Sequence, residues 1–282
     1  QYIYEHPEAR AKDLMDALKD PEIKGIFSCI GGYESVRLIP HIDLAVIRDN
    51  PKVFIGYSDT TITHLMFLKA GVSSFYGASI LAEFAENVAI HDYTREAVER
   101  ALFLSEPIGR VAAAKEWTGE HLPWVVENKD RQRKMEPCEG YELLQGRGKA
   151  HGRLIGGCIE VLEMAKGSAI WPETEMWKDG ILFFETSEDK PDPTYFEYWL
   201  RNYGTLGILQ QAKGLLFGKP YGNCYYEEYK EAIKKVVCRE LGLAELPILI
   251  NMNFGHTSPM TVLPYGAMAE IDCDSQSFSI LD

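Results

Sequence analysis

The chain has 282 residues, of which 46% are hydrophobic, and carries a formal net charge of −13 with a pI near 5.1. This hydrophobic content is enough to build a buried core and excludes a disordered chain. Nucleic acids and anionic membranes are bound through an excess of Lys and Arg, so the acidic balance argues against either as the main partner. No run of about 18 apolar residues occurs, and we therefore expect no transmembrane helix.

The six cysteines contain no C-x-x-C pair and lie mostly in apolar segments, at Cys29, Cys138, Cys158, Cys224, Cys238 and Cys273. Scattered cysteines of this kind are typical of reduced core thiols, and they predict a cytoplasmic protein without a disulfide framework. No signal-peptide pattern is visible. The first residue is Gln1 rather than an initiator methionine, so the sequence leaves open what precedes it.

The first third of the chain alternates predicted helices and strands. We expect helices over 7–20, 34–38, 41–50 and 94–104, strands over 23–30, 52–57 and 72–76, and a further helix directly after residue 58. This alternation is typical of a parallel sheet that is covered by helices on both faces. Such sheets bind ligands at the carboxyl ends of their strands, so we expect Gly31-Gly32 and Gly56-Tyr57-Ser58 to lie side by side.

Residues 107–150 separate the first third of the chain from the rest, because the periodic pattern of apolar residues is weak there. We interpret this stretch as a linker with short β pieces that lines a cleft between domains, and its basic cluster at 129–134 as a solvated loop. Beyond it we expect buried strands over 180–185, 212–218 and 246–251, helices over 159–166, 195–203 and 226–241, and an antiparallel pair within 261–280. The sequence thus predicts an α/β protein with domains at 1–106 and 151–282.

Ser58 is the first candidate nucleophile, because it follows a strand and precedes a helix within half of a G-x-S-x-G pattern. Such a turn lifts the hydroxyl above the sheet and points the first helix amides at a ligand. Ser58 and Asp59 are also ordinary helix caps, which is the alternative explanation. Glu185 ends a predicted strand and His256 follows another, and Ser…Glu…His is a known chain order for catalytic triads.

Two alternatives remain for the acid and the base: Glu185 could pair with an arginine, and His256 could cap a loop. The other histidines are weaker candidates. We expect His6, His91 and His121 on the surface, and His41, His64 and His151 beside helix or strand ends. The position of His64 on its helix should turn it away from Ser58.

Five spaced motifs resemble the LD-carboxypeptidase family of serine peptidases, which includes the self-immunity proteins that inactivate microcin C. They are Gly31–Pro40, Phe54–Thr61, Leu154–Cys158, Leu182–Glu188 and Phe254–Thr257. The resemblance implies a Rossmann-like N-terminal domain, a smaller α/β C-terminal domain and an active site between them, in a homodimer without metal or cofactor. It also implies that Ser58 is the nucleophile, Glu185 the acid and His256 the base.

The oxyanion hole that the resemblance implies uses backbone amides of the Gly31-Gly32 turn and of Asp59. Three features depart from the family pattern. The family's first strand would precede residue 1, Glu34 stands where Gly is common, and Glu188 lies close enough to Glu185 to be the triad acid instead.

The resemblance implies hydrolysis of a C-terminal amide, either in a murein tetrapeptide or in a substrate of the microcin-immunity type. An alternative is an amidase that cleaves aspartyl-nucleotide conjugates, and another is a protein that only sequesters a peptide or nucleotide. We expect Tyr57, Trp117 and Trp124 to bind substrate, since an aromatic ring can stack on a base for about 1–3 kcal/mol. The two tryptophans could equally pack the interdomain loop.

Overall fold

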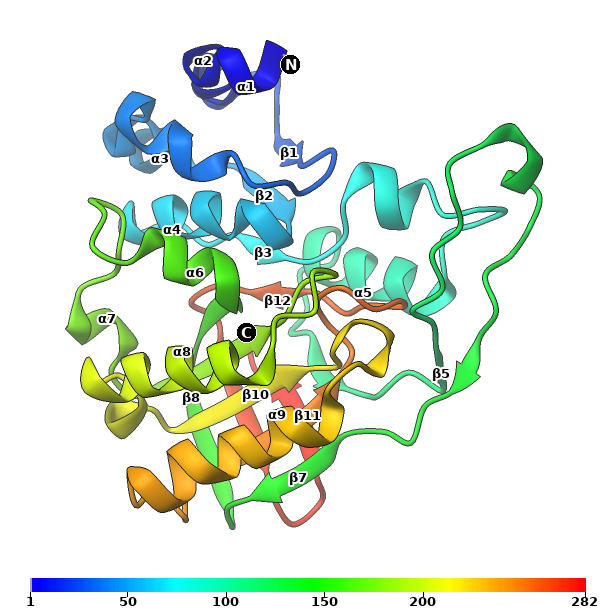
Figure 1. Ribbon diagram of the computed structural model, residues 1–282. Coiled ribbons are helices and arrows are strands. Elements are labelled where there is room, and N and C mark those ends of the chain that lie inside the picture. Colours follow the sequence, from blue (N-terminus) through cyan, green and yellow to red (C-terminus); the bar gives the residue numbers. More distant parts are fainter. Residues whose placement is uncertain (1) are drawn as a thin grey trace.

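The computed structural model describes residues 2–282, and two sheets form the two halves of the molecule (Figure 1). The first sheet has the order β1-β2-β3-β12, in which β1 (Gly25–Phe27), β2 (Val53–Gly56) and β3 (Phe75–Tyr76) run parallel. β12 (Leu263–Pro264) pairs antiparallel with β3, so a segment near the C-terminus completes the first sheet. The predicted α/β class is confirmed.

The second sheet has eight strands in the order β4-β14-β13-β8-β9-β10-β11-β7. Its centre is the parallel set of β8 (Lys149–Cys158), β9 (Gly180–Glu185), β10 (Gly214–Gly218) and β11 (Ile248–Met252). β9 and β11 are buried along their whole length, as expected for apolar runs that are covered on both faces. β13 (Met268–Asp272) and β14 (Ser277–Ile280) confirm the predicted antiparallel pair near the C-terminus.

Residues 107–150 contribute strands to the second sheet rather than forming a separate connection. β4 (Gly109–Val111) pairs with β14, and β7 (Glu142–Gln145) pairs with β11, so both edges of the sheet come from this stretch. Between them, β5 (Glu116–Trp117) and β6 (Glu136–Pro137) form a small ribbon at the base of a long loop. The predicted linker therefore belongs to the second sheet, and one segment of the predicted C-terminal domain, β12, belongs to the first sheet.

Helices cover both sheets (Figure 1). They are α1 (Tyr2–Glu5), α2 (Pro7–Lys19), α3 (Leu44–Asp49), α4 (Thr61–Lys69), α5 (Asp92–Leu102), α6 (Ile159–Ala165), α7 (Thr174–Trp177), α8 (Pro193–Thr205) and α9 (Tyr226–Ile233). The helix predicted at 34–38 is a 3₁₀ helix, Ser35–His41, because Pro40 lacks an N–H and disfavours α geometry at the residue before it. The strand predicted at 72–76 is shorter in the structure and covers only β3. Gly71, at φ +77, follows the end of the preceding helix.

The two halves share one hydrophobic core. The rings of Tyr76 from β3, Tyr265 directly after β12, and Phe183 from β9 are fully buried, with centroids 5.2–6.4 Å apart. This junction lies directly beneath the carboxyl ends of β2 and β9, and it fixes how residues from the two sheets meet. Within residues 2–282, no helix has both the length and the apolar character needed to cross a membrane.

Candidate active site

Ser58 stands at a sharp turn between β2 and α4. Its φ is +62, a left-handed conformation that is uncommon for a residue other than glycine and typical of strained functional turns. Gly56 precedes the turn, and a Cβ there would lie 2.8 Å from Thr60 Oγ1, so the turn has no room for a larger residue. The strand-to-helix turn that the sequence predicts at Ser58 is confirmed.

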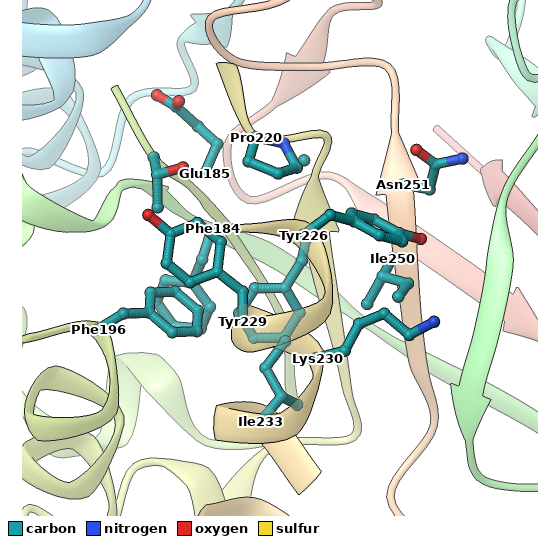
Figure 2. A pocket seen from close by; sticks show the side chains of 13 residues that line it. Phe184, Glu185, Phe196, Pro220, Tyr226, Tyr229, Lys230, Ile233, Ile250 and Asn251 are labelled. Atoms are coloured by element: carbon teal, nitrogen blue, oxygen red, sulfur yellow. The ribbon is translucent and has the colours of Figure 1, made fainter. Parts of the chain in front are cut away.

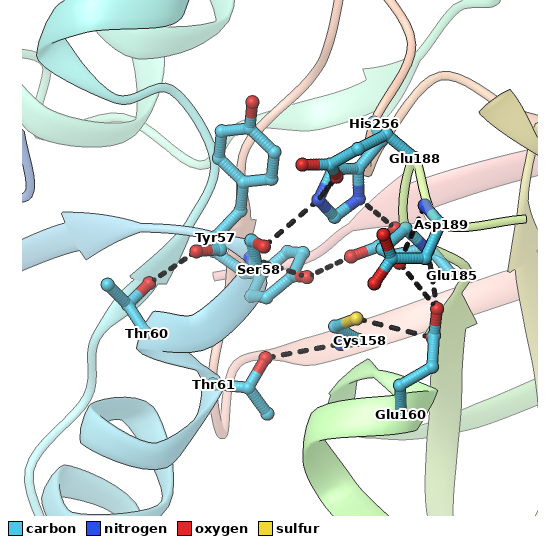
Figure 3. Close-up of polar contacts among 12 residues, drawn as sticks. Tyr57, Ser58, Thr60, Thr61, Cys158, Glu160, Glu185, Glu188, Asp189 and His256 are labelled. Carbon is cyan, nitrogen blue, oxygen red and sulfur yellow. Dashed lines mark hydrogen bonds and ion pairs between the residues drawn. The ribbon is translucent and has the colours of Figure 1, made fainter. Parts of the chain in front are cut away.

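Ser58, His256 and Glu185 form one chain of hydrogen bonds (Figure 3). His256 Nε2 lies 3.0 Å from Ser58 Oγ, and Nδ1 lies 2.7 Å from Glu185 Oε2. Glu185 is the last residue of β9, and His256 arrives on the loop after β11. Gly255 permits this approach, because a Cβ at its φ of +93 would lie 2.6 Å from Glu185 Oε2.

His256 has a second carboxylate neighbour. Glu188 Oε2 lies 3.1 Å from Nε2, on the side of the ring that faces Ser58, while Glu185 occupies the Nδ1 side. Burial of the ring would lower the pKa of His256, but the charges of Glu185, Glu188 and the more distant Glu160 outweigh it and raise this pKa to about 9. Of the two glutamates that the sequence left open, Glu185 is the buried one on Nδ1, where a triad acid belongs.

The Gly31-Gly32 turn lies against Ser58, as predicted. A Cβ on Gly31 would stand 2.8 Å from Ser58 Oγ, so only glycine fits there. Within residues 2–282, the amides of Gly31, Gly32 and Asp59 donate no hydrogen bond, which leaves them available to an incoming oxygen.

The carboxylate of Asp59 fastens the two turns together. It accepts hydrogen bonds from the amides of Glu34 and Ser35 and, at 2.7 Å, from the Ser35 hydroxyl. Burial raises the pKa of Asp59 while these donors act against the rise. The charge of Glu34 is directed to Arg37, 2.8 Å away. Asp59 therefore positions the glycine turn through its side chain as well as offering its own amide.

A cavity of about 360 Å³ opens above Ser58 and His256. Its wall includes four carboxylates and one guanidinium, from Glu83, Glu86, Glu120, Glu188 and Arg133. Arg133 donates from Nε to Glu86 at 3.1 Å and also pairs with it through Nη2, so this residue is part of the wall. The other residues of the basic cluster at 129–134 are exposed, as expected for a solvated loop. A second cavity, of about 20 Å³ and lined by both aromatic and polar side chains, lies beside α9 (Figure 2) and has room for about one water.

The three aromatic residues predicted to bind substrate differ in position. Tyr57 lines the large cavity, with its ring edge-on to His256 at 5.1 Å and its hydroxyl 3.2 Å from Glu83. Trp124 also lines the cavity and is 64% exposed. Trp117 is buried outside the cavity wall, with its ring 4.4 Å from Lys219 Nζ. The structure thus brings Tyr57 and Trp124 to the site and packs Trp117 into the core.

The remaining histidine near the nucleophile supports the turn. His64 is fully buried and contacts the Gly56 carbonyl and Ser74 Oγ, each at 2.8 Å, and burial lowers its pKa to about 3. It points away from Ser58 as predicted. In the part of the chain from Tyr2 to Asp282, no group of three or more His, Cys, Asp and Glu is arranged to hold a metal ion.

Several residues of the site carry no signal in the sequence. Tyr76 contacts both Ser58 N and Glu185, and Glu83, Glu86 and Arg133 form the cavity wall. They belong to no motif, since each reaches the site from a segment whose local pattern describes only a strand, a helix turn or a loop. A buried tyrosine at the end of a parallel strand was the one available signal, and it is common in ordinary cores.

Comparison with known families matches two parts of the chain. Residues 1–77 match the model for the LD-carboxypeptidase N-terminal domain, and residues 151–271 match the model for the LD-carboxypeptidase C-terminal domain. The residues that form the hydrogen-bonded chain are divided between these two matches, with Ser58 in the first and Glu185 and His256 in the second.

Curated relatives and solved structures agree with this match. The microcin C7 self-immunity protein MccF of Escherichia coli is 30% identical over 97% of this chain and 78% of its own length. A putative carboxypeptidase of Treponema pallidum is 28% identical over 97% of this chain and 77% of its own. The crystal structure of an MccF-like protein from Streptococcus pneumoniae in complex with AMP superposes with a TM-score of 0.91 at 31% identity, covering 100% of this chain and 85% of that one. The chain belongs to the LD-carboxypeptidase family.

Proposed function

We propose that the chain is a serine carboxypeptidase that hydrolyses a C-terminal amide bond through Ser58, His256 and Glu185. The observation that carries this proposal is the continuous hydrogen-bonded chain at 3.0 and 2.7 Å, which ends at a strained serine beneath free backbone amides. A helix cap needs neither a histidine on its hydroxyl nor a buried carboxylate behind that histidine, so the capping alternative leaves both unexplained.

The proposed acylation step begins when Ser58 Oγ attacks the scissile carbonyl and transfers its proton to His256 Nε2. Glu185 stabilises the imidazolium that forms, and the amides of Asp59 and the Gly31-Gly32 turn receive the negative oxygen of the tetrahedral intermediate. His256 then gives the proton to the leaving nitrogen, and the C–N bond breaks. Water attacks the acyl-serine by the same route in reverse, which releases the acid and restores Ser58.

A murein tetrapeptide is the first substrate candidate, because several relatives are named as carboxypeptidases and one as a probable murein peptide carboxypeptidase. The second candidate is an amide between an aspartyl residue and a nucleotide. It is favoured by Trp124, whose exposed indole in the cavity wall can stack on a base. Solved relatives are described in complex with AMP and with aspartyl sulfamoyl adenosine.

The test compares wild type with Ser58→Ala on a murein tetrapeptide and on aspartyl sulfamoyl adenosine, and measures release of D-alanine and of sulfamoyl adenosine. We expect wild type to turn over at least one of them and Ser58→Ala to lower kcat by about 10³-fold or more. Hydrolysis that survives within tenfold in the variant contradicts the proposal. Binding of either compound by wild type without turnover favours a sequestering protein.

Trp124→Ala separates the two substrate candidates. Loss of stacking should raise KM for aspartyl sulfamoyl adenosine by about tenfold, while the constants for the tetrapeptide change less than about twofold. Val126→Ala is the matched control, since Val126 is an exposed residue of the same loop outside the cavity wall. An equal effect of Trp124→Ala on both substrates argues against the nucleotide.

A further inference from the structure

We propose that Tyr76 is a positioning residue of this site, which couples the nucleophile turn in one half of the molecule to the triad acid in the other through a single hydroxyl group. The inference rests on the proposed function and extends it beyond the three triad residues.

The Tyr76 hydroxyl has one partner in each half of the site. It donates a hydrogen bond to Glu185 Oε1 at 2.5 Å and accepts one from the Ser58 amide at 3.2 Å. Glu185 belongs to β9 of the second sheet, and Ser58 follows β2 of the first. One atom therefore contacts both the backbone of the nucleophile and the carboxylate that supports the base.

Glu185 depends on this contact because it is buried and has few partners. Its carboxylate is 2% exposed and, among residues 2–282, has two hydrogen-bond partners, with Tyr76 at Oε1 and His256 at Oε2. A buried carboxylate without an arginine or lysine needs donors to remain charged. Tyr76 satisfies one oxygen and fixes the rotation of the carboxylate, so the other oxygen faces His256 Nδ1.

The second partner determines which amides remain for catalysis. Since the Ser58 N–H is used by Tyr76, it cannot also bind the oxyanion, and that task falls to Asp59 and the Gly31-Gly32 turn. The same bond restrains the left-handed backbone of Ser58 at the point where the chain is strained. Tyr76 thus acts on the orientation of both ends of the triad without reaching the substrate.

The tyrosine is itself held rigidly at the junction of the two halves. Tyr76 is fully buried on β3, and its ring packs against Phe183 of the second sheet and against Tyr265, which follows β12, with centroids 5.4 and 6.4 Å away. Burial and the charge of Glu185 raise the pKa of Tyr76 well above its usual range, so the hydroxyl stays protonated as a donor. A phenylalanine would keep this packing and remove only the two hydrogen bonds.

The test follows covalent labelling of Ser58 by a fluorophosphonate, in which Oγ bonds to phosphorus, fluoride leaves and His256 takes the proton. The second-order rate is measured by mass spectrometry over pH 6–10.5 for wild type, Tyr76→Phe and Tyr265→Phe. Tyr265 is the matched control, since it is equally buried and its hydroxyl donates to the Gly156 carbonyl instead of the triad.

We expect Tyr76→Phe to slow labelling by about tenfold or more, the loss that corresponds to a hydrogen bond with a charged group. The acid limb of the curve of labelling rate against pH should also move to higher pH by about 0.5 unit in this variant. The reason is that a Glu185 that lacks this donor stabilises the His256 imidazolium more strongly. The carboxylates of Glu188 and Glu160, which also face His256, are unchanged in this variant. If Tyr76 has a purely structural role, the labelling rate should fall equally in Tyr76→Phe and Tyr265→Phe, and the acid limb of the pH profile should stay where it is in wild type. That result overturns the proposal.

Incorporation of 3-fluorotyrosine at position 76 keeps the proposal testable if Tyr76→Phe does not fold. The more acidic phenol is a stronger donor to Glu185, so the acid limb should move to lower pH, opposite to the phenylalanine variant. An unmoved or higher limb contradicts the proposal. Because labelling needs only an activated Ser58, wild-type protein that labels but hydrolyses neither substrate refutes the carboxypeptidase assignment and leaves the test of Tyr76 valid.

Discussion

Glu188 lies 3.1 Å from His256 Nε2, the nitrogen that also faces Ser58 Oγ. With Glu185 on Nδ1, the imidazole has a carboxylate beside each nitrogen, and this arrangement favours the doubly protonated ring. A charged imidazole cannot accept the Ser58 proton. In the proposed mechanism only the neutral fraction of His256 acts as the base, so Glu188, together with Glu185, should influence how much active protein exists at a given pH.

Glu188→Gln should make the site more active near neutral pH. Burial lowers the pKa of His256 and the carboxylates raise it to about 9, so removal of one carboxylate moves this pKa down and the acid limb of kcat/KM with it. A shift of about one unit raises the neutral fraction at pH 7 roughly tenfold. A pH–rate profile measures the shift. Asp189→Asn is the control, since Asp189 contacts Tyr33 rather than His256. If the acid limb of kcat/KM lies at the same pH in wild type, Glu188→Gln and Asp189→Asn, the role of Glu188 is refuted.

Glu185→Gln should have the opposite outcome and identify the triad acid. An amide on Nδ1 favours the wrong tautomer and no longer stabilises the imidazolium, so kcat should fall by about 10³–10⁴-fold. Steady-state kinetics of Glu185→Gln and Glu188→Gln, measured side by side, compare the two positions directly. If Glu188→Gln shows the larger loss of kcat, Glu188 is the triad acid.

Gly31→Ala should abolish activity while the protein still folds. The new Cβ would stand 2.8 Å from Ser58 Oγ and 2.9 Å from Ser58 Cβ, in the space that the attacking oxygen needs. We expect the labelling rate of Ser58 to fall by about 10²-fold or more, the loss typical of a damaged oxyanion hole. Gly25→Ala is the control, because its Cβ would meet its nearest atoms at an ordinary 3.5 Å. Full labelling of Gly31→Ala would show that the turn is not part of the site.

Asp59→Asn should loosen the glycine turn. All three hydrogen bonds from Glu34 and Ser35 are accepted by Oδ2, so an asparagine can keep its carbonyl oxygen there but replaces a charged acceptor with a neutral one. A hydrogen bond to a charged group contributes about 1.5–3 kcal/mol, against about 0.5–1.5 kcal/mol for a neutral one, so both the free energy of unfolding and the labelling rate should decrease. Asp43→Asn, at an exposed cap of α3, should change neither the labelling rate nor the stability by a comparable amount. Unchanged labelling in Asp59→Asn would contradict this role.

His256 should also make folding stability depend on pH. Its folded pKa of about 9 lies above the ordinary 6.5, so its contribution is fully present below pH 6.5 and is lost as pH rises through 9. The contribution is roughly 3 kcal/mol at most. Denaturant unfolding of wild type and His256→Gln between pH 6 and 10 measures it as the difference between the two curves. A difference that stays constant across this range contradicts the raised pKa.

Local sequence determined the secondary-structure elements and the strand ends at which the candidate catalytic residues lie. The β-branched run before Gly56, the apolar run that ends at Glu185 and the strand before His256 predict strand ends without any tertiary information. The Gly31-Gly32 turn is likewise local, since Gly32 has a positive φ that glycine adopts without strain. The left-handed backbone of Ser58 is not local, because a strained conformation of this kind is maintained by the surrounding structure. These local features are enough to name Ser58 and His256 as candidates and to leave Glu185 and Glu188 as candidates for the acid, while the role of the Gly31-Gly32 turn as an oxyanion hole came from the family resemblance.

Tertiary structure alone decided how those residues are connected, because the contacts span the chain: Ser58 and His256 are 198 residues apart. The choice between Glu185 and Glu188, the contact of Tyr76 with both ends of the triad, and the positions of Trp117 and Trp124 depend on how two sheets with a shared core are packed. The periodicity of apolar residues predicts which side chains of a strand face inward, but not which segment from elsewhere in the sequence they contact there. The sequence by itself thus names candidate reacting groups, and the packing of the two halves determines the distances between them and their electrostatic surroundings.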